Sequence, residues 1–229
     1  MIDQSNLGQS GARNSGLKNA TGEFIAFLDA DDYWAPTKLE LQVKLINDST
    51  QLVYCGILPF NDSESNIMNA ILPKYRGQCM RYFLELPAAS VVLSGESTAL
   101  FSRTLLEKVG NFDTTLNSVA GWDFFRRCSR VTNFNFTNEV LVNYRIHENN
   151  MSHSRVSVIS DIRYAYSKIF ADKDWKISEK EESRILISLE FSFLKTYLRN
   201  FDIWIALPCF VRMLRLLLSY WGKVLSGIK

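Results

Sequence analysis

Three aspartates within four residues are the first feature of this sequence that could do chemistry. Asp29, Asp31 and Asp32 directly follow an apolar run at residues 24–28. Carboxylates this close repel one another unless water or a cation neutralises them, and their hard oxygen atoms suit Mg²⁺ or Mn²⁺. A divalent ion held there could clamp a diphosphate and stabilise charge on a leaving phosphate. The cluster therefore predicts a site for a metal ion and a diphosphate.

The same aspartates allow other interpretations. In a solvated loop they would favour the N-terminus of the next helix. An EF-hand loop beginning at Asp29 would need glycine at its sixth position, where Trp34 stands. A phosphatase-like hydrolase using Asp29 is a further alternative, but Tyr33 is a poor match to its pattern, and no downstream lysine-and-acid motif pair supports it. The buried run before the cluster favours the metal site over the loop.

The elements around the aspartates follow an α/β order. Residues 23–28 have the length and composition of a strand buried on both faces, as in parallel sheets. A helix at 8–20 precedes this strand, a second helix begins near Pro36, and another strand is expected at 51–58. This order predicts an α/β fold. In such folds the ligand crevice lies at the carboxyl ends of the strands, where Asp29 stands.

The middle of the chain continues with shorter elements. Extended segments are expected at 97–102 and 134–144, and helices at 102–109 and 122–131. Ser102 can cap the first of these helices, because its hydroxyl can accept a hydrogen bond from a free N–H of the first turn. No internal repeat or low-complexity segment interrupts this pattern.

The chain from residue 154 to 229 is expected to be helical, with helices at about 156–171, 178–199 and 205–225. Pro208 predicts a break or a start in the last of them, because proline removes a backbone hydrogen bond. No stretch reaches ~18 uninterrupted apolar residues, so no membrane-spanning helix is expected.

The last predicted helix, at 205–225, carries one narrow basic face. Arg212, Arg215, Ser219 and Lys223 recur along it at steps of three or four. Such a face fits a helix that lies in a membrane interface, where basic groups meet anionic lipid heads. The alternative is a helix that packs on the rest of the protein or on a second copy of it.

The composition describes an ordinary globular chain. Of 229 residues, 47 % are apolar and 22 % are charged, and the net charge of +2 is too small to indicate binding to nucleic acid. The four cysteines are scattered without a CxxC pair, which excludes a zinc framework and favours a reducing location. The first residues have neither the positive nor the apolar region of a signal peptide. A cytoplasmic protein is expected.

Four segments together resemble the family 2 glycosyltransferases. They are Asn6–Leu17 with its Ala-Arg-Asn motif, Ala20–Asp32 with its Gly-Glu-Phe strand and Asp-Ala-Asp-Asp turn, Leu105–Asp113, and Tyr144–Ser152 with its Tyr-Arg-x-His motif. The resemblance implies the GT-A fold: an α/β domain with a mixed, mostly parallel sheet and flanking helices, here over residues 1–153. Residues 154–229 would be a C-terminal helical extension.

The resemblance also implies an activity. The family transfers a sugar from a nucleotide-diphosphate donor to a hydroxyl acceptor, here a cell-surface polysaccharide or a lipid-linked glycan, with inversion and with Mg²⁺ or Mn²⁺ as cofactor. A lipid-linked acceptor would place the protein at the inner face of the membrane, touching it through the C-terminal helices.

The resemblance assigns roles to individual residues. Asp31 is the implied principal metal ligand, with Asp32 beside it. The residues implied to hold the nucleotide and its diphosphate are Arg13, Asp29, Arg145 and His147. Without the family, Arg13 would be read as a surface helix residue paired with an acid, and His147 as an ordinary loop histidine.

Two departures from the family pattern lead to an alternative function. The segments that match begin late in the family's domain, which predicts an N-terminally truncated domain lacking about two strand–helix units, on the order of 60–70 residues at ~30 per unit. The acid expected as general base falls on Gly121, and Asp123 is the nearest retained candidate for that catalytic role. The alternative is a truncated, non-catalytic relative that acts as a binding or membrane-associated module.

Overall fold

The computed structural model describes residues 2–61, 68–85, 92, 95–147 and 155–225. The chain forms two compact units. The first consists of Met1–Phe83 and Ala88–Asp161, and the second of Leu84–Pro87 and Ile162–Lys229. The boundary predicted between residues 153 and 154 lies outside the described residues.

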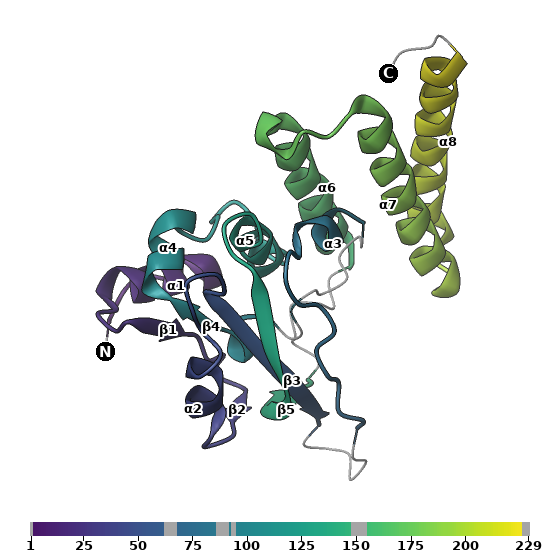
Figure 1. Ribbon diagram of the computed structural model, residues 1–229. Helices are drawn as coiled ribbons and strands as arrows, with labels where there is room; N and C mark the ends of the chain where they lie inside the picture. The colour runs from purple at the N-terminus through teal and green to yellow at the C-terminus, as the bar shows by residue number, and fades with distance from the viewer. Residues whose placement is uncertain (1, 62–67, 86–91, 93–94, 148–154, 226–229) are drawn as a thin grey trace. The chain divides into compact units, whose positions relative to one another are not determined.

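The first unit is built on a sheet whose strands lie in the order β1-β4-β3-β5-β2 (Figure 1). The strands are β1 Phe24–Ala26, β2 Tyr33–Trp34, β3 Leu52–Phe60, β4 Leu100–Ser102 and β5 Phe134–Arg145. The predicted α/β class with a mixed sheet is confirmed, but the expected predominance of parallel pairing is not observed. Among the described strands only β3 and β5 pair in parallel, and the other three pairings are antiparallel.

The position of β4 explains this difference. β4 lies between β1 and β3 and runs antiparallel to both, so β1 and β3 point the same way without being neighbours. β5 runs parallel to β3. The carboxyl ends of β1, β3 and β5 therefore face the same edge of the sheet, which is the edge where ligands bind in α/β folds.

Helices cover both faces of this sheet (Figure 1). Their bounds are α1 Gly8–Asn19, α2 Lys38–Val43, α3 Met80–Glu85, α4 Arg103–Val109 and α5 Ala120–Cys128, and a 3-10 helix, η1, spans Gly95–Thr98. Residues of α1, α4 and α5 join one hydrophobic cluster, and α2 contributes to the other. The expected cap of α4 is present, because the Leu105 N–H donates to the Ser102 hydroxyl over 3.1 Å.

The core follows from the alternation of side chains along β3. Leu52 and Tyr54 face the cluster of α4 and α5, whereas Cys55 and Ile57 face the cluster of α2. β1 is shorter than its predicted strand, and Leu28 is exposed, so that strand is not buried on both faces.

The second unit contains three long helices. They are α6 Arg155–Ala171, of which residues from Ile162 belong to this unit, α7 Glu179–Arg199 and α8 Ile203–Leu225. Inside the unit, Glu190 of α7 is only 1 % exposed and receives two hydrogen bonds from Arg163 of α6, at 2.9 and 2.7 Å. Arg212 of α8 lies 3.4 Å from the same carboxylate. The buried Glu190 carboxylate therefore links the three helices through two more exposed arginines.

The expectation that Pro208 would break the last helix or start it is wrong, because α8 runs from Ile203 through Pro208 to Leu225. Pro208 lies in the second turn of the helix, where its missing N–H removes a single backbone bond near one end. Within the described residues, α8 is the one helix long and apolar enough to cross a membrane. Length and composition alone are weak grounds for a membrane span.

Candidate functional site

The three aspartates lie in a turn that crosses the carboxyl end of the sheet. This acid turn, Asp29–Asp32, leaves β1 at one edge and leads into β2 at the other. The Asp32 N–H donates to the Asp29 carbonyl over 3.1 Å and closes the turn. Just before it, the Phe27 ring packs edge-on against Phe101 and Phe112, with ring centroids 5.9 and 5.4 Å apart. Aromatic packing thus fixes the entry to the acid turn.

Arg13 of α1 holds the first aspartate of the turn. Its guanidinium donates to Asp29 Oδ1 over 2.9 Å and to Glu96 Oε1 over 2.8 Å. Arg13 is 8 % exposed, so it is a buried link between three elements and does not lie on the surface. Glu96 is a residue that the sequence analysis did not single out.

The 3-10 helix η1 supports the turn from its other side. The Ser97 hydroxyl accepts a hydrogen bond from the Asp29 N–H over 3.1 Å, and the Ser97 carbonyl accepts one from the Trp34 indole over 2.8 Å. Neighbouring Glu96 is 4 % exposed. Burial raises the pKa of Glu96, Arg13 opposes this change, and the charge of Asp29 adds to it.

The far side of the acid turn meets the end of β5. His147 Nε2 lies 2.9 Å from Asp31 Oδ2, and both side chains are partly exposed. The backbone N–H of Arg145 donates to Asp32 Oδ1 over 3.2 Å, and the Arg145 Nε donates to the Asp31 carbonyl over 3.1 Å. The Arg145 guanidinium also binds the Tyr33 hydroxyl. The structure thus brings Asp31, Asp32, Arg145 and His147 together.

Asp32 differs from its two neighbours because it is buried. Its Oδ2 atom has no hydrogen-bond partner in the described part of the chain. Burial raises the pKa of Asp32 above its ordinary value, and the nearby Ser97 side chain and the Arg145 backbone N–H oppose that change only partly. A buried carboxylate oxygen without a partner is costly, and a cation beside it would relieve that cost.

The side chains of the acid turn fit a metal ion whose coordination shell is completed by water or by substrate oxygens. Among the described residues, no group of three or more His, Cys, Asp or Glu side chains forms a complete metal cage. Mg²⁺ is commonly held by one or two carboxylates, with water and substrate phosphates completing its shell. The carboxylates of Asp31 and Asp32 on one short turn fit that pattern.

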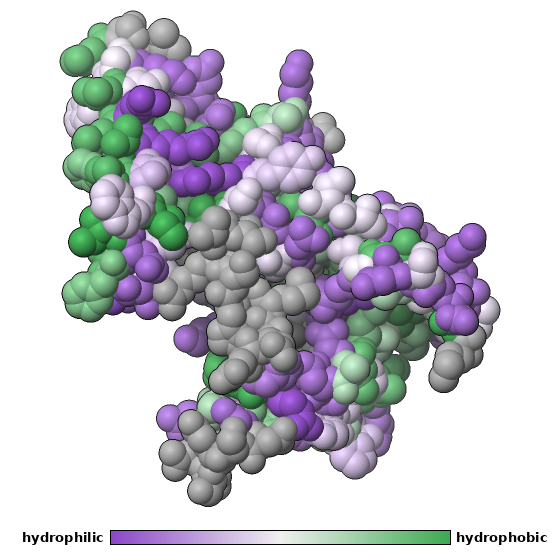
Figure 2. Space-filling view, turned by 180° about the vertical axis from the view of Figure 1, so that it is seen from behind, coloured by the Kyte–Doolittle hydropathy of each residue, from purple (hydrophilic) through white to green (hydrophobic). Residues whose placement is uncertain are grey.

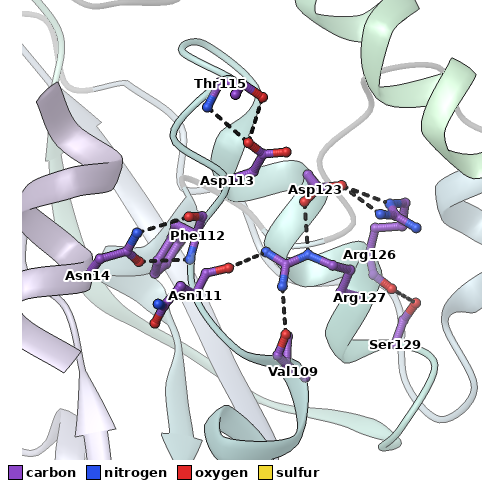
Figure 3. Close-up of polar contacts among 10 residues, drawn as sticks. All are labelled: Asn14, Val109, Asn111, Phe112, Asp113, Thr115, Asp123, Arg126, Arg127 and Ser129. Carbon is purple, nitrogen blue, oxygen red and sulfur yellow. Dashed lines mark hydrogen bonds and ion pairs between the residues drawn. The ribbon is translucent and has the colours of Figure 1, made fainter. Parts of the chain in front are cut away.

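Asp123, the candidate base, lies in a clamp of two arginines (Figure 3). It is 2 % exposed, and its carboxylate accepts hydrogen bonds from Arg126 at 2.6 and 3.2 Å and from Arg127 at 2.9 Å. Arg127 also donates to the carbonyls of Val109 and Asn111, each over 2.8 Å. Asp123 therefore holds α5 to the end of α4 through Arg127.

Gly121, where the resemblance places the base, faces the Glu96 carboxylate. A Cβ atom at Gly121 would lie 2.4 Å from Glu96 Oε1, far inside van der Waals contact. The Glu96 carboxylate thus occupies the space into which a side chain at residue 121 would extend. No pattern in the sequence indicates this contact, because Glu96 and Gly121 belong to separate short elements.

The contacts of Asp123 predict the result of replacing it by asparagine. Asp123→Asn should lower the free energy of unfolding by about 1–3 kcal/mol, because hydrogen bonds from Arg126 and Arg127 lose their charged acceptor. Urea unfolding followed by circular dichroism measures the change. Asp48→Ala, in an exposed loop, is the control and should change the value by less than about 0.5 kcal/mol. A variant as stable as the parent would show that the clamp is not structural.

Comparisons with known proteins agree with this fold. The family described as Glycosyl transferase family 2 matches residues 1–110. An uncharacterized glycosyltransferase of Rickettsia typhi is 28 % identical over 166 residues, which cover 71 % of this chain and 52 % of that protein. The Escherichia coli enzyme WfgD, named as a UDP-Glc:alpha-D-GlcNAc-diphosphoundecaprenol beta-1,3-glucosyltransferase, is 56 % identical over 39 residues, 17 % of this chain and 15 % of the enzyme.

A solved structure extends the comparison to the fold. The mannosyltransferase PcManGT from Pyrobaculum calidifontis, in complex with GDP-Man and Mn2+, matches with a TM-score of 0.50 and 18 % identity. The match covers 97 % of this chain and 68 % of that one.

The fold is therefore that of a GT-A glycosyltransferase. Residues 1–110 belong to glycosyltransferase family 2. The chain spans about half the length of its Rickettsia typhi relative.

Proposed function

We propose that this protein transfers a sugar from a nucleotide-diphosphate donor to a hydroxyl group, and that the acid turn binds the donor diphosphate. The observation that carries the proposal is the meeting of Asp31 with His147 and Arg145 at the carboxyl end of the sheet. Carboxylates for a cation and basic groups for phosphate oxygens lie side by side there. A site that holds both acidic and basic side chains suits a metal-bound diphosphate better than it suits a metal ion or a diphosphate alone.

A divalent cation, Mg²⁺ or Mn²⁺, is part of this proposal. Asp31 would hold it, and Asp32, whose Oδ2 has no hydrogen-bond partner among the described residues, would support it. The ion would neutralise charge on the departing diphosphate. The Mn2+ and GDP-Man named with the structural relative support this choice of ligands.

The residues of this chain would act on the donor mainly by binding and orientation. Arg145 and His147 would contact diphosphate oxygens, and Arg13 would keep Asp29 in place beside the nucleotide. The acceptor oxygen would attack the anomeric carbon from the side opposite the diphosphate, which inverts that centre, as the family resemblance implies. The acceptor proton needs a base, and Asp123 remains the candidate from the sequence, although two arginines bind its carboxylate.

A relative supports the proposed class of acceptor. WfgD is named for a diphosphoundecaprenol-linked acceptor. We therefore propose a lipid-linked glycan or a cell-surface polysaccharide as the acceptor, with the protein on the cytoplasmic side of the membrane.

Removing Asp31 tests the donor site. Asp31→Ala should weaken Mn²⁺-dependent binding of UDP-glucose or GDP-mannose by more than about 100-fold. Residues that only hydrogen-bond to a metal ligand contribute about 10–100-fold to metal affinity, and loss of a ligand itself should cost more. Isothermal titration calorimetry with and without Mn²⁺ measures this, and Asp48→Ala is the control. Equal donor affinity in the variant and the parent would refute the assignment.

A second candidate, a non-catalytic family relative, is favoured by one observation. The expected base position holds Gly121, and the nearest acid, Asp123, is enclosed by two guanidinium groups. Metal-dependent donor binding without transfer to any lipid-linked acceptor would support this candidate.

A further inference from the structure

The outer side of α8 carries a continuous row of exposed apolar side chains. The α8 stripe consists of Trp204, Leu207, Val211, Leu214, Leu218, Trp221 and Leu225, which recur at alternating steps of three and four and are 39–88 % exposed. Steps of three and four keep side chains on one face of a helix. Green apolar residues gather along α8 at the upper left of Figure 2.

The fold itself does not use the α8 stripe. The opposite side of α8 faces inward, where Ala206 and Cys209 are buried. α8 also contains no Asp or Glu, whereas Arg212 and Arg215 follow one flank of the stripe. Arg212 lies near Glu190, but Arg215 makes no ion pair within the described part of the chain.

The basic and apolar groups meet in a surface hollow. Its lining consists of Trp204, Leu207, Pro208, Val211, Arg212 and Arg215. Four of these side chains are apolar and two are guanidinium groups, which bind phosphate oxygens in a bidentate manner. A ligand that fits this lining has an apolar chain next to an anionic phosphate.

We propose that α8 lies in the plane of an anionic lipid surface, with the α8 stripe in the acyl boundary and lipid phosphates on Arg212 and Arg215. Amphipathic helices with aromatic and leucine residues on one side and basic residues beside them bind membranes in this way. Trp204 and Trp221, near the two ends of the stripe, are of the type enriched at the membrane–water boundary. This contact does not depend on sugar transfer.

A membrane-spanning position for α8 conflicts with the charges on the helix. Arg212 and Arg215 lie near the middle of Ile203–Leu225, so spanning would place two guanidinium groups near the bilayer centre, where charged side chains are costly. Arg212 is also tied to Glu190 of α7. A helix lying in the plane keeps both arginines at the level of the lipid phosphates.

A second copy of the chain is a poorer partner for the stripe. Alternating steps of three and four also occur in coiled coils, where charges flanking the seam select the partner. Because α8 has no acidic residue, two copies packed through the stripe would place arginines along the same seam without acidic counterparts. Anionic lipid heads supply the complementary charge.

Vesicle sedimentation with the full chain tests the proposal. We expect binding to vesicles of phosphatidylcholine with about 30 % phosphatidylglycerol, since each basic residue gains from negative surface charge, and much weaker binding to pure phosphatidylcholine. High salt should release the protein, because screening shortens the reach of surface charge. Equal binding to both vesicles, or protein that resists a salt and alkaline carbonate wash as a spanning helix would, overturns the proposal.

Paired variants separate the two parts of the surface. Arg215→Gln should weaken binding about fivefold, the effect of one basic residue near an anionic surface, and Lys173→Gln, an exposed lysine of the same unit, is its control. Leu218→Gln should weaken binding at least about tenfold through lost apolar burial, with exposed Leu39→Gln of α2 as control. If light scattering shows a dimer without lipid that Leu218→Gln dissociates, the stripe is a contact between copies and the lipid proposal fails.

Discussion

Arg13→Met is expected to lower the free energy of unfolding by about 3–5 kcal/mol, the cost of leaving a buried charge without its partner. Arg13 is the guanidinium between Asp29 and Glu96, at 2.9 and 2.8 Å. Without it, two buried or half-buried carboxylates face each other. Urea unfolding followed by circular dichroism measures the loss, and Lys18→Met, which removes an exposed charge from the same helix, should change the value by less than about 0.5 kcal/mol.

A second substitution shows whether the lost stability comes from Glu96. Burial already raises the pKa of Glu96, and Arg13 opposes that change, so losing Arg13 favours the protonated acid. Glu96→Gln in the Arg13→Met background removes the unpaired charge and should recover about half of the loss. If the double variant is no more stable than Arg13→Met alone, lost packing of the Arg13 side chain, and not the Glu96 charge, explains the effect.

Local patterns in the sequence were sufficient to predict the acid turn and several of the helices and strands. The apolar run before Asp29 and the Ser102 cap of α4 are short-range patterns, and the structure shows β1 and α4 there. The resemblance grouped Arg145 and His147 with Asp31, and the structure brings all three together across more than 110 residues. The roles proposed for them in donor binding stay predictions that the Asp31→Ala experiment tests.

Features that depend on tertiary packing could not be read from the chain. A strand pattern at 97–102 does not state its direction, so the antiparallel insertion of β4 between β1 and β3 was not expected. Pro208 was expected to break the last helix or start it, but packing of α8 against the other helices of the second unit outweighs one lost backbone bond. Strand direction and helix continuation are decided by neighbours that local propensity does not describe.

Glu96 illustrates the same limit at the site. It lies in the short 3-10 helix η1, whose sequence has no apolar periodicity, so nothing in its neighbourhood marks it as buried or paired. Its place is defined by Arg13 from one side and by the bare backbone of Gly121 from the other. The Glu96 carboxylate therefore lies beside the first turn of α5, although residue 121 itself has no side chain.

Gly121→Asp is expected to lower the free energy of unfolding by about 3–5 kcal/mol, because the new side chain must displace Glu96 from Arg13 and adds a third carboxylate to a buried site. The Cβ contact of 2.4 Å with Glu96 Oε1 leaves no room for both groups. Gly16→Asp in α1, where a Cβ atom would meet nothing within 4 Å, is the matched control. It should change stability by at most about 1 kcal/mol, since glycine itself is a poor helix former.

The decisive measurement is a double-mutant cycle with Glu96→Ala. If the two carboxylates compete for one space, Gly121→Asp should be far less harmful when Glu96 is alanine, because the introduced carboxylate can then extend into the vacated position beside Arg13. The coupling free energy should reach about 2 kcal/mol or more, above the roughly 0.3–0.5 kcal/mol typical of independent sites. Additive effects would mean that Gly121 is required for another reason. Strong coupling would show that a carboxylate from either η1 or α5 can occupy the same place next to Arg13.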